Sequence, residues 1–131
     1  DLWLPLCDTL GIREKVRLIG QTERVSDYLQ IADAFVFPSK NMDSAPNTLL
    51  EAIRMGLPVV AATVGGVSEI AQNNGLLVPP DDTEALTRAL QEMASDPERR
   101  KLWGANSARR GQSYSVEARC VELEKIYHSV L

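Results

Sequence analysis

The chain has 131 residues, 44% of them hydrophobic and 24% charged, which is the size and composition of one globular domain. No run approaches the roughly 18 apolar residues of a membrane span, and the first residues lack the basic flank of a signal peptide. A formal charge of −4 is the wrong sign for a domain that binds nucleic acid phosphates. We therefore expect a cytoplasmic protein without a nucleic-acid partner, and leave open a peripheral contact with the membrane in a longer protein.

The residues that commonly bind metals are few and scattered. Cys7 and Cys120 lie near opposite ends of the chain, and His128 is its only histidine, so the usual nitrogen and sulfur donors cannot assemble a four-ligand site. We read both cysteines as buried small hydrophobic residues and expect neither a metal nor a cofactor.

Short apolar runs separated by glycine and proline predict strands. Four such runs occur, at residues 16–20, 34–39, 58–63 and 75–80. The second run is apolar at successive positions, which is typical of a strand buried on both faces of a parallel sheet.

Helical spacing fills the segments between and after these strands. The predicted helices cover residues 25–32, about 46–55, a short stretch through 69–71, 83–95, a helix starting at Pro97 and a terminal helix to Leu131. Asp81 together with Glu84, Asp96 and Ser115 are the expected caps of the last three. Because strands and helices alternate, we predict a single, partial α/β domain over residues 1–131, with a Rossmann-like parallel sheet, helices on both faces and a helical C-terminal region.

The candidate site follows from this fold. Ligands of open parallel sheets bind at the carboxyl ends of the strands, where helix N-termini offer unpaired N–H groups. Two loops meet there, at residues 39–47 and 63–66. Asp43 and Glu51 should lie roughly 10 to 13 Å apart with a helix N-terminus between them, a spacing that suits an extended diphosphate ligand.

Each of these residues also has a purely structural interpretation. Asp43 could cap the helix, and Glu51 could pair with Arg54 three residues later on a solvated surface. Gly65 and Gly66 could serve only to make a tight turn.

A series of linked motifs makes the sequence recognisable. In chain order they are Phe37-Pro38-Ser39, the run from Asp43 to Ala52, Gly56-Leu57-Pro58-Val59-Val60-Ala61, Gly65-Gly66-Val67-Ser68-Glu69 and Gly75-Leu76-Leu77-Val78-Pro79-Pro80. This order resembles the C-terminal, donor-binding domain of GT-B glycosyltransferases of the retaining family 4. The resemblance covers nearly the whole chain.

The resemblance implies a role for the residues between the second predicted strand and its helix. It makes Asp43 and Glu51 the catalytic acidic pair, with Asp43 facing the hydroxyls of the donor sugar and Glu51 accepting hydrogen bonds from ribose. The implied donor-binding residues are Asp43, Ser44, Ala45, Pro46, Asn47, Thr48, Leu49 and Glu51. The implied ligand is a nucleotide-diphosphate sugar, with an acceptor that the resemblance does not identify.

The chain departs from the family pattern in two ways. The family usually has glutamate where this chain has Asp43, one methylene shorter. The family's first two strands, with the arginine and lysine that bind phosphate, have no counterpart before Val16, so we expect an N-terminally truncated domain. Lys40 is the nearest cation, and we interpret it as a solvated loop lysine.

Loss of two strands should leave a gap in the sheet. We expect residues 16–20 to move beside residues 34–39, or a second copy of the chain to pair with that open edge. The leading hypothesis for function is the donor-binding part of a retaining, hexosyltransferase-like glycosyltransferase that is inactive alone. The alternative is a nucleotide-binding or protein-interaction module without catalysis.

Overall fold

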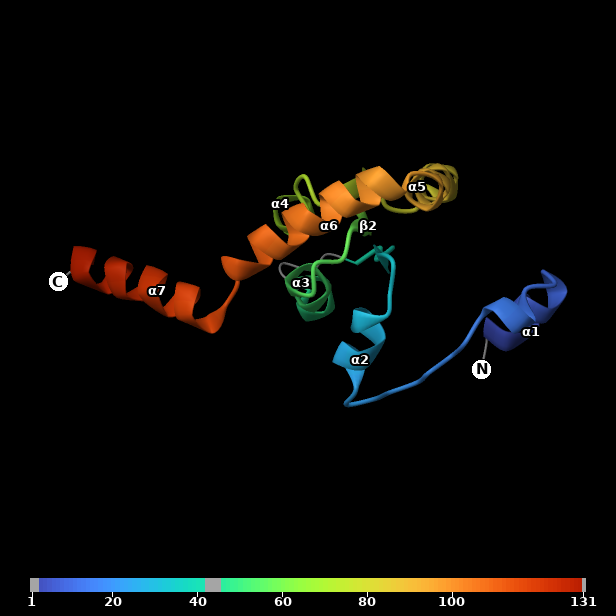
Figure 1. Cartoon of the computed structure of the whole chain (residues 1–131), viewed down its shortest axis with the longest axis horizontal. Coiled ribbons are helices and arrows are strands. Elements are labelled where there is room, and N and C mark those ends of the chain that lie inside the picture. The colour runs from blue at the N-terminus through green and yellow to red at the C-terminus, as the bar shows by residue number, and fades with distance from the viewer. Residues whose placement is uncertain (1–2, 42–45, 131) are drawn as a thin grey trace.

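The computed structural model describes residues 3–41 and 46–130 (Figure 1). Its elements, in chain order, are α1 (Trp3–Thr9), the 3-10 helix η1 (Arg13–Lys15), α2 (Val25–Gln30), β1 (Phe35–Phe37), α3 (Asn47–Arg54), β2 (Val59–Ala62), α4 (Val67–Ile70), β3 (Gly75–Val78), α5 (Thr83–Ser95), α6 (Pro97–Gln112) and α7 (Val116–Val130).

The strands form a parallel sheet in the order β1-β2-β3. Phe35 pairs with Val59, and Val59 pairs in turn with Gly75. Each connection between successive strands contains a helix, α3 after β1 and α4 after β2. The predicted Rossmann-like α/β fold is therefore confirmed, with three of the four expected strands.

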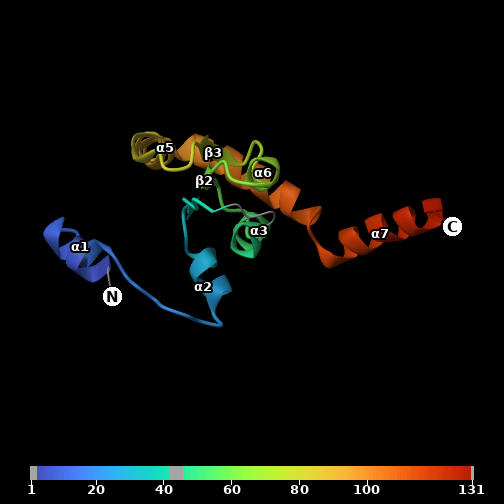
Figure 2. The ribbon, with the colours of Figure 1, turned by 180° about the vertical axis from the view of Figure 1, so that it is seen from behind.

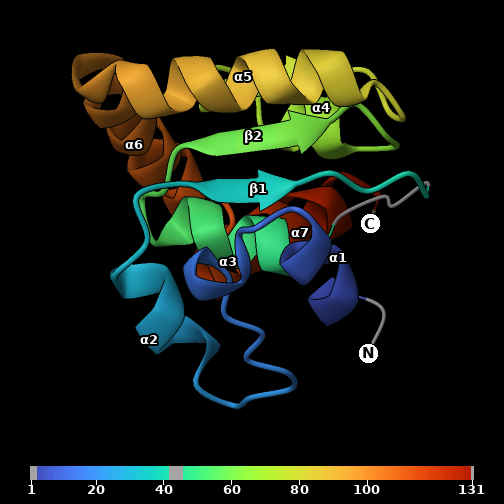
Figure 3. The same cartoon turned by 90° about the vertical axis from the view of Figure 1, so that its right-hand side faces the viewer.

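The central strand β2 is buried on both faces because helices cover both. Val59 and Ala61 pack on one face against α3 and α4, in a cluster that includes Leu49 and Ile53. Val60 and Ala62 point to the opposite face, against Met93 of α5 and Trp103 of α6. Figure 3 shows α5 and α3 on opposite sides of the strands. Burial of each such valine or isoleucine contributes roughly 1.5–3 kcal/mol to folding.

The prediction of a strand at residues 16–20 is wrong. This segment has no regular structure, and Leu18 and Ile19 are about half exposed. Figures 1 and 2 show it as an extended connection that carries α1 away from the sheet. A strand forms only when a neighbour satisfies its backbone groups, and no described strand lies beside it.

The outer edge of β1 therefore has no partner among the described residues. The first expected solution, in which residues 16–20 move beside β1, is wrong. Val36 is 39% exposed, so the expectation that this strand is buried on both faces is also wrong, because the helices that cover β2 leave the Val36 face of this edge strand partly uncovered. Pairing of this edge with a second copy stays a prediction.

Side-chain caps define where the long helices begin. The Asp96 carboxylate accepts a hydrogen bond from the Arg99 N–H at 2.9 Å and caps α6 as predicted. Ser115 accepts from the Ala118 N–H at 3.1 Å before α7. The predicted cap of α5 is off by one residue, because Asp82 rather than Asp81 accepts from the Ala85 N–H, at 2.8 Å.

Small residues let α6 cross α3 closely. A Cβ added at Gly111 would lie 2.7 Å from the Cα of Arg54, and one at Gly104 would lie 2.8 Å from the Gly56 carbonyl oxygen. Ser107 stands between these glycines and is fully buried. The close contact anchors α6 against α3 and so fixes the helix that begins at the candidate site.

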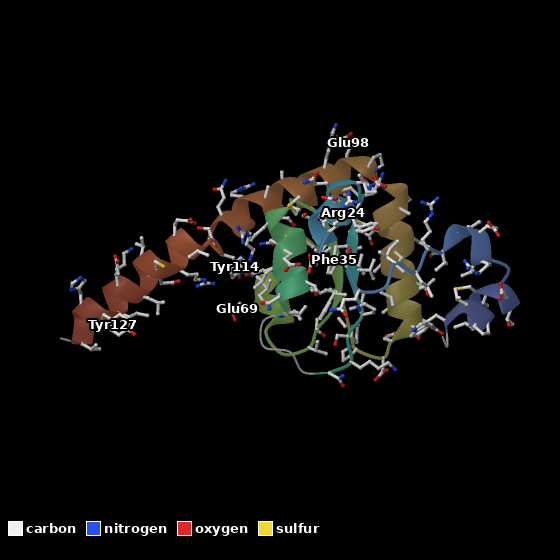
Figure 4. The ribbon with its side chains drawn as sticks, turned by 90° about the horizontal axis from the view of Figure 1, so that it is seen from below. Arg24, Phe35, Glu69, Glu98, Tyr114 and Tyr127 are labelled. Carbon is white, nitrogen blue, oxygen red and sulfur yellow. The ribbon has the colours of Figure 1, made fainter. Side chains whose placement is uncertain are left out.

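The last helix, α7, extends away from the sheet and has no buried residue. Figure 4 shows Tyr127 near its far end, whereas Tyr114 lies where α6 meets α7. Cys120 is exposed on α7, so its interpretation as a buried residue is wrong, whereas Cys7 is buried as expected. Among the described residues, no helix is long and apolar enough to cross a membrane.

Candidate functional site

The carboxyl ends of the three strands open into the loops where the sequence predicts the site. β1 ends at Phe37, β2 at Ala62 and β3 at Val78, and the parallel register brings these ends to one edge. Asp43, Ser44 and Ala45 lie outside the described residues. The predicted distance between the Asp43 and Glu51 carboxylates therefore stays a prediction.

The N-terminus of α3 lies directly after this edge. Pro46 occupies the cap position, and its carbonyl accepts hydrogen bonds from the N–H groups of Leu49 and Leu50, both at 3.1 Å. Asn47 and Thr48 are exposed, and their N–H groups have no backbone acceptor among the described residues. The first N–H groups of a helix carry a partial positive charge, so this end attracts an anion.

Leu49 has a structural role as well as a place in the predicted site. Its side chain is fully buried in the cluster between α3 and β2. Its N–H already donates to the Pro46 carbonyl. The N–H groups of Asn47 and Thr48 are therefore better placed than that of Leu49 to bind a ligand. Burial of Leu49 and Ile53 on the inner face of α3 turns Glu51 toward the outside.

The Glu51 carboxylate is exposed and makes no ion pair with any residue that the structure describes, Arg54 included. It borders a cavity of about 450 Å³ between α2 and α3. The lining residues are Glu23, Val25, Ser26, Leu29, Glu51, Arg54 and Met55. This cavity cannot be predicted from the sequence, because α2 packs against α3 through contacts between Leu29, Ala52 and Leu57. Leu29 lies far from the other two in the chain, so local hydrophobic spacing does not reveal the contacts.

Lys40 forms an ion pair with Asp81, and both side chains are well exposed. The pair joins the loop after β1 to the loop after β3 across the end of β2. Exposed pairs of this kind contribute little to stability. The interpretation of Lys40 as a solvated loop residue agrees with its 71% exposed side chain.

The second predicted loop makes a tight turn into α4. Gly65 has a φ of 52°, a left-handed conformation that glycine adopts without steric cost. Gly66 then precedes the four-residue helix α4. The turn interpretation is sufficient to explain both glycines. Within residues 3–41 and 46–130, no three His, Cys, Asp or Glu side chains come together in a way that could hold a metal ion.

Comparison with protein families identifies the family to which the chain belongs. The family model described as "Glycosyl transferases group 1" matches residues 3–96. The chain belongs to the group 1 glycosyl transferases. The match includes α3, the candidate site and all three strands, so the resemblance to GT-B glycosyltransferases holds at the level of family and fold.

Known relatives of this glycosyl transferase chain are similar to it over nearly its whole length. It is 34% identical over 131 residues to a D-inositol 3-phosphate glycosyltransferase of Streptomyces griseus, covering 96% of this chain and 27% of the relative. It is 28% identical over 126 residues to a lipopolysaccharide core biosynthesis mannosyltransferase of Rhizobium meliloti, covering 92% of this chain and 36% of the relative. Both relatives are thus about three times longer.

A solved structure shows that the similarity to larger proteins extends to the three-dimensional fold. Sucrose-phosphate synthase from Thermosynechococcus elongatus superposes with a TM-score of 0.83 at 30% identity, over 96% of this chain and 33% of that one. This group 1 glycosyl transferase chain therefore matches between 27% and 36% of the length of each of these larger proteins.

Proposed function

We propose that this chain is the donor-binding part of a retaining glycosyltransferase of family 4, and that it binds a nucleotide-diphosphate sugar at the N-terminus of α3. The observation that carries the proposal is the combination of an exposed helix N-terminus at Asn47 and Thr48 with an exposed Glu51, one turn later, that forms no ion pair with a described residue. The family match and the transferase names of the relatives support it.

The helix end supplies the phosphate-binding part of the proposed site. Its partial positive charge favours a diphosphate without a metal ion, as do the Asn47 and Thr48 N–H groups, which have no backbone acceptor among the described residues. In the transfer reaction the bond between the anomeric carbon and the diphosphate oxygen breaks, and negative charge grows on that oxygen. Donors already in place at the helix end stabilise this charge. The acceptor hydroxyl oxygen forms the new bond to the anomeric carbon, and its proton goes to the departing diphosphate.

Carboxylates supply the sugar-binding part. Glu51 has two oxygens that can accept hydrogen bonds from the two ribose hydroxyls, and the adjoining cavity between α2 and α3 gives room for the nucleoside. Asp43, eight residues before Glu51 with the helix start between them, would face the donor sugar. Ser44, Ala45 and Pro46 would bring the backbone to the diphosphate.

The chain spans 27% and 36% of the two relatives compared above. We propose that it forms one part of a donor domain and is inactive alone. Hexosyl transfer in the cytoplasm, with or without a peripheral membrane contact, completes the proposal. The alternative, a nucleotide-binding module without catalysis, uses the same site.

Binding of nucleotides of different phosphate length tests the proposal. Calorimetric titration with UDP, GDP and ADP should show saturable binding of at least one diphosphate. The matching monophosphate should bind at least about tenfold more weakly, because it loses charge-assisted hydrogen bonds at the helix end. Absence of binding for all three diphosphates, or equal affinity for the monophosphate, would refute the site.

A further inference from the structure

A second cavity, of about 600 Å³, lies between α6 and the segment that joins α4 to β3. Its lining residues are Gln72, Asn73, Asn74, Leu102, Trp103, Asn106, Arg109, Arg110 and Ser113. Asn74 directly precedes β3, so the cavity lies at the amino end of that strand. The candidate donor site lies at the carboxyl ends of the strands, so the two sites are at opposite ends of the sheet.

The second cavity is positively charged. Two arginines line it, and no aspartate or glutamate does. In the part of the chain that the structure describes, neither Arg109 nor Arg110 takes part in an ion pair. In a chain of net charge −4, two neighbouring arginines without a carboxylate partner indicate room for an external anion.

Hydrogen bonds hold these arginines in place without using all their donors. One Arg109 guanidinium nitrogen donates to the Asn106 side-chain oxygen at 3.0 Å, and the Asn106 amide donates to the Asn73 carbonyl at 2.8 Å. Arg110 donates to the Glu69 carbonyl, which ties α6 to the end of α4. Its Nε–H is nevertheless buried without a partner among the described groups.

The wall next to the arginines is apolar. Leu102 lines this wall and is 60% exposed, whereas Trp103 also lines it but is only 8% exposed and packs mainly in the core. Gln72 and Asn73 are exposed at the rim and carry amides that can bind hydroxyl groups. The cavity thus combines two guanidinium groups, which can bind an oxyanion through paired hydrogen bonds, with an apolar surface against which a sugar ring can pack.

We propose that this cavity binds the oxyanion of a small phosphate- or carboxylate-bearing saccharide, at a site separate from the nucleotide donor. Arg109 and Arg110 bind the oxyanion, Gln72 and Asn73 bind hydroxyls, and the sugar ring packs on Leu102. The site is independent of whether Glu51 binds the donor.

The two tryptophans provide a direct readout. Trp103 lines the cavity, and Trp3 is 62% exposed on α1, away from it (Figure 1). Titration with inorganic phosphate, followed by the two indole N–H signals in an ¹⁵N NMR spectrum, should shift the Trp103 signal saturably and leave Trp3 in place. Chloride at equal ionic strength controls for screening. Glucose 6-phosphate and glucuronate then distinguish a phosphate-bearing from a carboxylate-bearing ligand.

Arg109→Gln is the test variant, because Arg109 is exposed and lacks the structural contact of Arg110. It should weaken binding at least about tenfold, the loss of charge-assisted hydrogen bonds. Arg88→Gln on α5, outside the cavity, is the matched control and should bind like the unaltered protein, as should Glu51→Gln. No saturable Trp103 shift with any of the three anions, or an unchanged affinity in Arg109→Gln, would overturn the proposal.

Discussion

Replacing Gly75 with alanine should cost the fold about 3 kcal/mol or more, at the upper end of what overpacking a close contact costs. Gly75 begins β3 and pairs with Val59 of the central strand. An added Cβ would lie 1.8 Å from the Val59 carbonyl oxygen and 2.8 Å from its nitrogen. Both atoms belong to the backbone, and the Val59 N–H already donates to the Asn74 carbonyl at 3.0 Å. Relief of the clash therefore requires the start of the strand pair to open.

Urea unfolding followed by circular dichroism measures this loss. Gly20→Ala is the matched control, because Gly20 has a φ of 73° but nothing within 4 Å of the added Cβ. The control should lose only the roughly 1–2 kcal/mol of a left-handed alanine. If Gly75→Ala were as stable as this control, the close pairing of β2 with β3 would be incorrect.

Glu51→Gln should weaken binding of the nucleoside diphosphate by about 1.5–3 kcal/mol, or roughly ten- to a hundredfold in Kd. The substitution keeps the size of the side chain. It removes the negative charge and one of the two carboxylate oxygens that would accept hydrogen bonds from the ribose hydroxyls. Because Glu51 is exposed and forms no ion pair with a described residue, the substitution should leave the unfolding free energy nearly unchanged.

Glu98→Gln provides the control for this binding experiment. Glu98 is an exposed carboxylate in the first turn of α6, away from the N-terminus of α3 (Figure 4). Its neutralisation should not change the affinity. Equal affinities of Glu51→Gln and the unaltered protein, measured by calorimetry, would remove Glu51 from the donor site.

Local signals in the sequence located most of the fold. The strands within 34–39, 58–63 and 75–80 were predictable because each is a short apolar run with turn residues at its ends. The boundaries of α5 agree with the prediction, and Asp96 caps α6 as expected. Residues 16–20 have the same local pattern as the true strands. They form none because pairing depends on a neighbour, which a local pattern does not reveal.

Part of the candidate site was also predictable from local sequence patterns. The outward direction of Glu51 follows from the helical spacing of Leu49, Ala52 and Ile53, which are all fully buried. The two cavities were not predictable, since each is formed by segments far apart in the sequence. Asn73 and Asn106, which are joined by a hydrogen bond beside the second cavity, are 33 residues apart.

The most direct test of the donor site is the response of backbone amides to a bound nucleoside diphosphate. In an ¹⁵N NMR titration, the amides of Asn47 and Thr48 should show the largest shifts, because their N–H groups would donate to the diphosphate. Amides far from both cavities, such as that of Cys120 on α7, should not move. Saturable binding that leaves Asn47 and Thr48 unshifted and moves other amides would contradict the account.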